Sequence, residues 1–114
     1  MRFPSLAVPF GLLVLSGCVA YSAPSAYEIR QLRDARDACL MQNVIRLDDY
    51  RSDAAVIGSA AVAACQREDA AIISALAGPD GFRESEMARQ VQQGSQQVAT
   101  QYVLSHRAAR SVRR

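Results

Sequence analysis

The stretch CLMQNVIRLDDYRSDAAVIGSAAVAAC, residues 39–65, decides the fold, because it has a cysteine at each end and a break in its centre. Ser52 or Asp53 at that break is a favourable N-cap for a following helix. Cys39 precedes Ser52 by thirteen residues, and Cys65 follows it by thirteen. In an antiparallel helical hairpin that turns at Ser52, the two cysteines face each other.

Both sides of the break have the hydrophobic period of an amphipathic helix. Residues 27–50 contain no glycine or proline, and residues 53–77 are rich in alanine. The apolar side chains of the first stretch that share one arc are Ile29, Leu32, Cys39, Leu40, Leu47 and Tyr50, and those of the second are Val62, Cys65, Ile72 and Leu76. Since both cysteines lie on these faces, we predict a Cys39–Cys65 disulfide, which stabilises such a loop by roughly 3–4 kcal/mol in the chain-entropy model.

Polar residues interrupt both apolar faces. In the register set by the cysteines, residues whose numbers sum to about 104 lie opposite each other. Arg36 then faces Glu68 and Asp69, so we expect these charges to pair. Asn43 faces Ala61 and Val62, where a small neighbour leaves room for its amide.

A third helical segment is predicted over residues 80–109. The run Gly78-Pro79-Asp80-Gly81 ends the second helix. The apolar residues that recur at helical spacing beyond this run are Phe82, Met87, Val91, Val98 and Tyr102. Gly94-Ser95 follows a polar stretch and indicates a kink or weak point, so one helix and two helices remain alternatives. The fold class predicted for the chain is a small all-α domain.

The N-terminus has the pattern of a secretory signal. Arg2 supplies a positive charge, and residues 3–15 follow without any charge. Thirteen residues are too few to span a bilayer, which needs about 20 apolar residues in a helix. Pro4 and Pro9 also disfavour a permanent transmembrane helix. The length of this uncharged segment and the residues on either side of it therefore favour a cleaved signal peptide.

The signal ends in Leu15-Ser16-Gly17-Cys18, which resembles the lipobox of bacterial lipoproteins. The resemblance covers residues 1–18 and implies cleavage before Cys18, with diacylglycerol on its thiol as the covalent lipid and no other cofactor. Val19, in place of an aspartate, favours sorting to the outer membrane, facing the periplasm. The alternative is an ordinary signal peptide that happens to contain Cys18.

The resulting organisation has four parts. These are a signal peptide (1–17), a lipidated cysteine with a short linker (18–27), a helical domain (28–109) and a basic tail (110–114). The chain has three cysteines, an odd number that lipidation of Cys18 explains. A free linker of nine residues reaches at most about 30 Å from the membrane.

Reactive and metal-binding groups are sparse. A redox role for Cys39 and Cys65 is disfavoured by their wide separation, since redox dithiols are usually close in sequence. His106 is the sole histidine and is expected to be a solvated tail residue, so we predict neither a catalytic residue nor a metal site. Asp48 and Asp49 are adjacent, which on a helix directs their side chains about 100° apart and favours a charged helix end.

Four arginines near the C-terminus form the last candidate site: Arg107, Arg110, Arg113 and Arg114. One interpretation is a solvated tail that interacts with the helix dipole. The other is contact with anionic lipid head groups, lipid A phosphates or the acidic patch of a protein. The net charge of +2 gives no reason to expect a nucleic-acid partner.

These features favour a non-enzymatic lipoprotein that binds the membrane through its anchor and an envelope protein through an exposed helical face. The alternative is a small-molecule or lipid binder that uses a cleft between the third helix and the hairpin. The many alanines leave few bulky side chains to line a deep pocket, which favours the first function.

Overall fold

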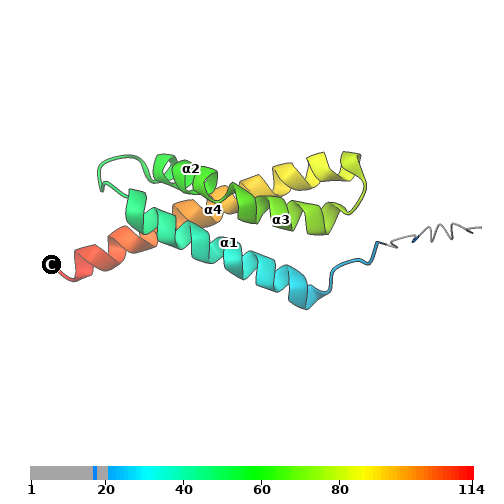
Figure 1. Cartoon of the computed structure of the whole chain (residues 1–114). Coiled ribbons are helices and arrows are strands. Elements are labelled where there is room, and N and C mark those ends of the chain that lie inside the picture. The colour runs from blue at the N-terminus through cyan, green and yellow to red at the C-terminus, as the bar shows by residue number, and fades with distance from the viewer. Residues whose placement is uncertain (1–16, 18–20) are drawn as a thin grey trace, which may run out of the picture.

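The computed structural model describes Gly17 and residues 21–114, and this part of the chain is helical without strands. The predicted lipobox residues Leu15, Ser16 and Cys18 lie outside the described residues. The helices are α1 (Ala26–Leu47), α2 (Ala54–Ala64), α3 (Gln66–Ala77) and α4 (Gly81–Val112). In Figure 1, α2 and α3 follow each other beside α1, and α4 extends along the whole hairpin. The predicted all-α class is therefore confirmed.

The start of α1 is fixed by a capping box. The Ser25 hydroxyl accepts a hydrogen bond from the Glu28 amide at 3.2 Å, and the Glu28 carboxylate accepts one from the Ser25 amide at 2.6 Å. These two bonds satisfy amides that have no partner inside the helix. Of the two predicted caps of the second helix, Asp53 is the one used, with its carboxylate accepting from the Ala55 amide at 2.8 Å.

The first helix is shorter than predicted, which changes the environment of Tyr50. Because α1 ends at Leu47, Tyr50 lies in the loop and has a left-handed backbone with φ 58°. Its side chain does not join the apolar face of α1 as we expected, and the residue is 41% exposed.

The second predicted helix is divided at Cys65 into α2 and α3. The Cys65 amide donates to the Val62 carbonyl, three residues back, so the last turn of α2 is tightened. Cys65 is fully buried and forms the predicted disulfide with Cys39, with 6.0 Å between the two Cα atoms. The predicted hairpin register is therefore confirmed across this break.

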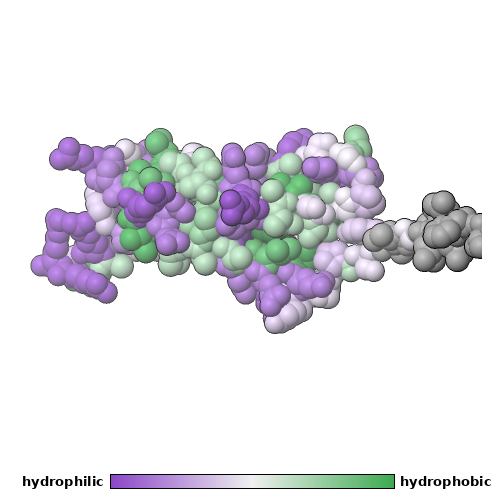
Figure 2. Space-filling model, viewed as in Figure 1, coloured by the Kyte–Doolittle hydropathy of each residue, from purple (hydrophilic) through white to green (hydrophobic). Residues whose placement is uncertain are grey.

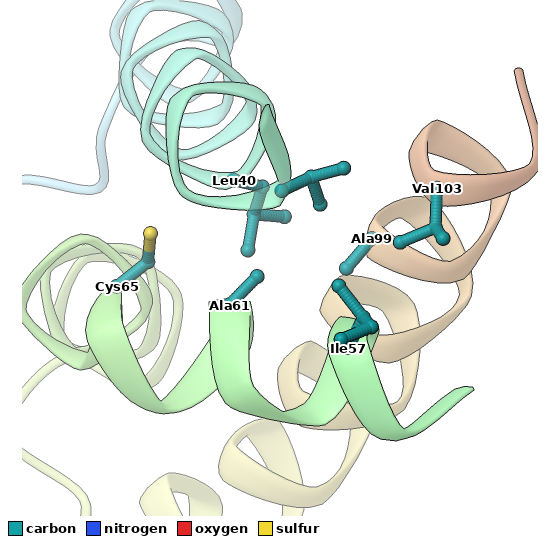
Figure 3. Packing of buried hydrophobic residues seen from close by; sticks show 7 residues of the cluster. Leu40, Ile57, Ala61, Cys65, Ala99 and Val103 are labelled. Atoms are coloured by element: carbon teal, nitrogen blue, oxygen red, sulfur yellow. The ribbon is translucent and has the colours of Figure 1, made fainter. Parts of the chain in front are cut away.

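The core lies where α1, α2 and α4 meet. Figure 3 shows Leu40 of α1 pointing toward Ala61 of α2, and Ile57 of α2 lying against Ala99 of α4. Leu40, Ala61 and Ala99 are completely buried. With alanine at two of these positions, the helices pack closely around a small apolar volume.

α4 is continuous through Gly94-Ser95, so of the two predicted alternatives the single helix is confirmed. Ser95 is completely buried, and its hydroxyl donates to the Asp69 carboxylate at 2.7 Å. The small side chain of Ser95 thus lies in close contact with α3. The helix also continues to Val112, so most of the predicted tail, residues 110–114, is part of an ordered helix.

Two glycines of the domain are predicted to respond oppositely to replacement by alanine. A Cβ atom at Gly58 of α2 would lie 2.9 Å from the Thr100 hydroxyl and 3.1 Å from the Thr100 backbone nitrogen, whereas one at Gly94 meets nothing within 4 Å. We expect Gly58→Ala to lower the free energy of unfolding by about 1–2 kcal/mol, because overpacking exceeds the gain in helix propensity. Gly94→Ala should raise it by up to about 1 kcal/mol.

Urea denaturation followed by circular dichroism measures both changes. A Gly58→Ala protein that is as stable as the Gly94→Ala protein would contradict the close α2–α4 contact.

Candidate functional site

The buried charges of the hairpin bind partners other than those predicted. Arg36 donates to the Asp37 carboxylate at 2.8 and 2.9 Å rather than to Glu68 or Asp69. Asp69 is 5% exposed and accepts from Ser95 of α4. The predicted register considered only the two helices of the hairpin, whereas the Ser95 hydroxyl that bonds to Asp69 belongs to α4. The expected ion pair of Arg36 with Glu68 or Asp69 is therefore wrong.

Burial raises the pKa of Asp69 above its usual value, while the Ser95 hydroxyl and the nearby Arg36 charge oppose this rise. We therefore expect Ser95→Ala to raise that pKa further and to lower the free energy of unfolding at pH 7 by about 1.5–3 kcal/mol, as for other hydrogen bonds to charged groups. The stability that the Ser95 hydrogen bond contributes is present when Asp69 is ionised. It is lost as the pH falls through the pKa of Asp69 in the folded protein.

Denaturation at pH 7 and at progressively lower pH tests this expectation. Ser85→Ala is the matched control, because Ser85 is exposed on α4 and its hydroxyl contacts only carbonyls of its own helix. Equal effects of the two replacements would contradict the role of Ser95.

The disulfide lies beside Asn43 and Glu68. The Asn43 amide donates to the Cys39 carbonyl at 2.9 Å and lies 3.5 Å from both sulfur atoms. A carboxylate oxygen of Glu68 and the two sulfurs lie within 4.8 Å of one another, a spacing that suits a metal ion. The disulfide consumes both thiols, so these three residues can act as metal ligands only after reduction.

The C-terminal end of α4 is joined to the hairpin by a partly buried ion pair. The Asp48 side chain is inaccessible to solvent and accepts three hydrogen bonds of 2.7–3.1 Å from Arg107. Arg107 also donates to the Ser52 carbonyl at 2.8 Å. The hydrogen bonds from Arg107 lower the pKa of Asp48 more than burial raises it. Arg107 therefore bonds to residues of this chain, while its side chain remains 26% exposed.

The second aspartate of the pair, Asp49, organises the α1–α2 loop. Its carboxylate accepts hydrogen bonds from the Arg51 amide and from the amide and hydroxyl of Ser52, at 2.6–2.9 Å. These bonds lower the pKa of Asp49 to about 2. Asp48 and Asp49 thus stabilise the end of the hairpin in two separate ways, as the interpretation of a charged helix end implied.

His106 is not the solvated tail residue that we expected. Its Nε2 atom lies 2.7 Å from the Tyr50 hydroxyl, and the two ring centroids are 5.7 Å apart. The guanidinium carbon of Arg110 lies 4.1 Å from the centroid of the same Tyr50 ring, a cation–π contact. The left-handed turn at Tyr50 directs this ring onto α4, and the sequence held no local signal of that contact.

An open cleft of about 440 Å³ lies at this end of the molecule. The residues that line it are Asp49, Tyr50, Arg107, Arg110, Ser111 and Arg114. With Arg46, Arg51 and Arg113, this end carries six arginines against Asp48, Asp49 and Asp53. Figure 2 shows hydrophilic side chains projecting from the end where α4 finishes in Figure 1. We call this region the basic end.

The grooves between α4 and the rest of the domain differ in size. An open groove of about 520 Å³ is lined by Val62 of α2 and by Gln92, Gln93, Gln96 and Gln97 of α4. Two further grooves are smaller. One of about 210 Å³ lies between α1 and α4, with Met41, Ile45 and Tyr102 in its walls. Another of about 290 Å³ includes Leu76 and Met87. Both are below the roughly 300–1,000 Å³ of typical ligand pockets.

Comparison with protein-family models, with curated proteins and with solved structures finds no match to this chain. Among the residues that the structure describes, no helix combines the length and the apolar character needed to cross a bilayer.

Proposed function

We propose that this protein is a lipoprotein anchored through diacylglycerol on Cys18 in the outer membrane, facing the periplasm. Its helical domain acts as a non-enzymatic interaction module that presents the basic end to an acidic patch of an envelope protein. The membrane anchor is supported by the lipobox, whereas the interaction is supported by the geometry of the domain.

The contact that carries the interaction proposal is the Asp48–Arg107 pair. It holds the last turns of α4 against the hairpin, so that Arg110 is presented from an ordered helix and Arg113 and Arg114 follow directly after its last turn. Binding a carboxylate then costs less conformational entropy than it would for a disordered tail. Stacking of Arg110 on Tyr50 still leaves the edge of its guanidinium for two parallel hydrogen bonds to a carboxylate.

The anchor is tested by the intact mass of protein extracted from membranes and alkylated without reductant. The expected chain starts at Cys18, is heavier by its acyl groups and carries no alkyl adduct. An unlipidated chain, or one that retains residues 1–17, would refute the anchor.

The interaction is tested by site-specific photocrosslinking in cells. A photoreactive residue at Ser111, beside the basic end, should give a discrete protein adduct, and one at Ser85, also exposed on α4, should not. The Arg113→Ala/Arg114→Ala variant should lose the adduct, whereas Arg83→Ala/Arg89→Ala, with two exposed arginines near the other end of α4, should retain it. No adduct from Ser111, or equal adducts from both positions, would contradict the proposal.

A further inference from the structure

The linker packs on the domain already at Tyr21, three residues after Cys18, whereas the sequence suggested a free linker up to residue 27. The Tyr21 hydroxyl donates to the Ala75 carbonyl of α3 at 2.9 Å. Its ring lies over Gly78, where a Cβ atom would come within 2.7 Å of the Tyr21 ring. Gly78 is also the turn residue after α3, with φ 64°, so the linker packs at the point where α3 leads to α4.

This contact shortens the tether. Tyr21 is three residues after Cys18, and an extended chain covers at most about 3.6 Å per residue, which limits this span to about 11 Å. A lipid on Cys18 therefore keeps the end of the domain that carries the α3–α4 turn next to the bilayer. The earlier expectation of about 30 Å assumed that all nine linker residues were free.

The same end exposes three aromatic side chains. Phe82, in the first turn of α4, is 87% exposed, Tyr27 in the first turn of α1 is 66% exposed, and Tyr21 is 52% exposed. Figure 1 shows that the linker and the α3–α4 turn lie at one end of the molecule, opposite the C-terminus. Tyrosine is enriched at the membrane–water interface, and phenylalanine is among the apolar residues that interfacial surfaces insert into the boundary between head groups and acyl chains.

The rest of α4 is mostly polar on its exposed side, with Leu104 (55% exposed) and Val112 (87% exposed) as its exposed apolar residues. Its outward face in the middle of the helix carries the exposed glutamines Gln92, Gln93, Gln97 and Gln101, which are neither apolar nor cationic. The basic end follows at the far end of a 32-residue helix, which is about 48 Å long.

We propose that Phe82 and Tyr27, beside the docked Tyr21, form the surface by which this domain contacts the phospholipid bilayer that holds its anchor. α4 then projects the basic end away from that bilayer, toward partners in the periplasm. This inference rests on the proposed lipidation of Cys18, and the occupant of the aromatic surface is the bilayer itself.

The sequence has no tryptophan, so one introduced tryptophan reports on its own position. Phe82 and Val112 are matched sites, because both are 87% exposed and they lie near opposite ends of α4. We would compare Phe82→Trp with Val112→Trp in the chain that begins at Cys18. The disulfide leaves Cys18 as its free thiol, which is then coupled to a maleimide phospholipid in phosphatidylcholine vesicles.

With brominated phosphatidylcholine in the vesicles, we expect Phe82→Trp fluorescence to shift to the blue and to fall by about twofold, as for an interfacial aromatic. Val112→Trp fluorescence should not change. Quenching of both tryptophans would show a domain that lies flat, and quenching of neither would show a domain away from the bilayer. Either result overturns the proposal.

Tyr21→Ala, added to Phe82→Trp, tests the shortened tether. Freeing the linker should weaken the quenching while circular dichroism remains helical, and unchanged quenching would contradict the role of Tyr21. Because the lipid is attached chemically, these outcomes do not depend on whether cells modify Cys18. The intact mass of the cellular protein decides that separate question.

Discussion

Replacing Cys39 and Cys65 together with alanine is expected to lower the free energy of unfolding by roughly 3–4 kcal/mol. The disulfide joins residues 26 positions apart, and removing it restores the loop entropy of the unfolded chain. For a domain of this size, the loss corresponds to a fall in melting temperature on the order of 15 °C. The core of Leu40, Ala61 and Ala99 is too small to compensate for such a loss.

Urea denaturation of oxidised and reduced samples provides the control. Reduction should destabilise the unmodified protein to about the level of the double alanine variant, and it should leave that variant unchanged. If the variant and the oxidised protein unfolded at the same urea concentration, the disulfide would not be the principal constraint on the hairpin. Cys39→Ala alone is less informative, because it leaves a buried free thiol at Cys65.

The hairpin could be predicted because its determinants are local. Asp53 is an N-cap, Gly78 ends α3, and the two cysteines share a face with the apolar residues on either side of one break. Each of these features depends on residues within a few turns along the chain. The division at Cys65 could not be predicted, because its backbone, with φ −110° and ψ 24°, has no signature in the surrounding alanines.

The position of α4 on the hairpin depends on contacts between residues far apart in the sequence. We interpreted Gly94-Ser95 as a weak point because glycine and serine are poor helix formers. In the folded domain Ser95 is buried and bonded to Asp69, so tertiary packing outweighs that propensity. Of these two small residues, Ser95 marks a close contact with α3, whereas Gly94 meets no neighbour.

The basic end was only partly predictable for the same reason. The cluster of C-terminal arginines was visible in the sequence, but the contacts of Arg107 and His106 with the residues that follow α1 were not. That loop carries the buried Asp48, whose partner is 59 residues away in sequence. Periodicity identifies a buried face, but it does not identify which distant residue pairs with an acid at its edge.

Arg107→Ala is expected to lower the free energy of unfolding at pH 7 by about 2–4 kcal/mol, because it leaves the buried Asp48 carboxylate without its cation. Arg107 lowers the pKa of Asp48, so its contribution exists at pH values above the usual carboxyl pKa of 3.8 and is lost as the pH falls through the lower folded-state value. The difference in the free energy of unfolding between the unmodified protein and the Arg107→Ala variant should therefore become smaller in acid.

Arg110→Ala is the matched control for Arg107→Ala, since it lies one turn further along α4 and contributes one exposed cation–π contact, worth about 0.5–1 kcal/mol. Replacing Asp48 by asparagine together with Arg107→Met should recover part of the lost stability, because no buried charge then remains unpaired. Equal losses from Arg107→Ala and Arg110→Ala would show that the ion pair does not hold α4 on the hairpin. The basic end would then be a mobile cluster of charges, and the crosslink expected from Ser111 would lose its structural basis.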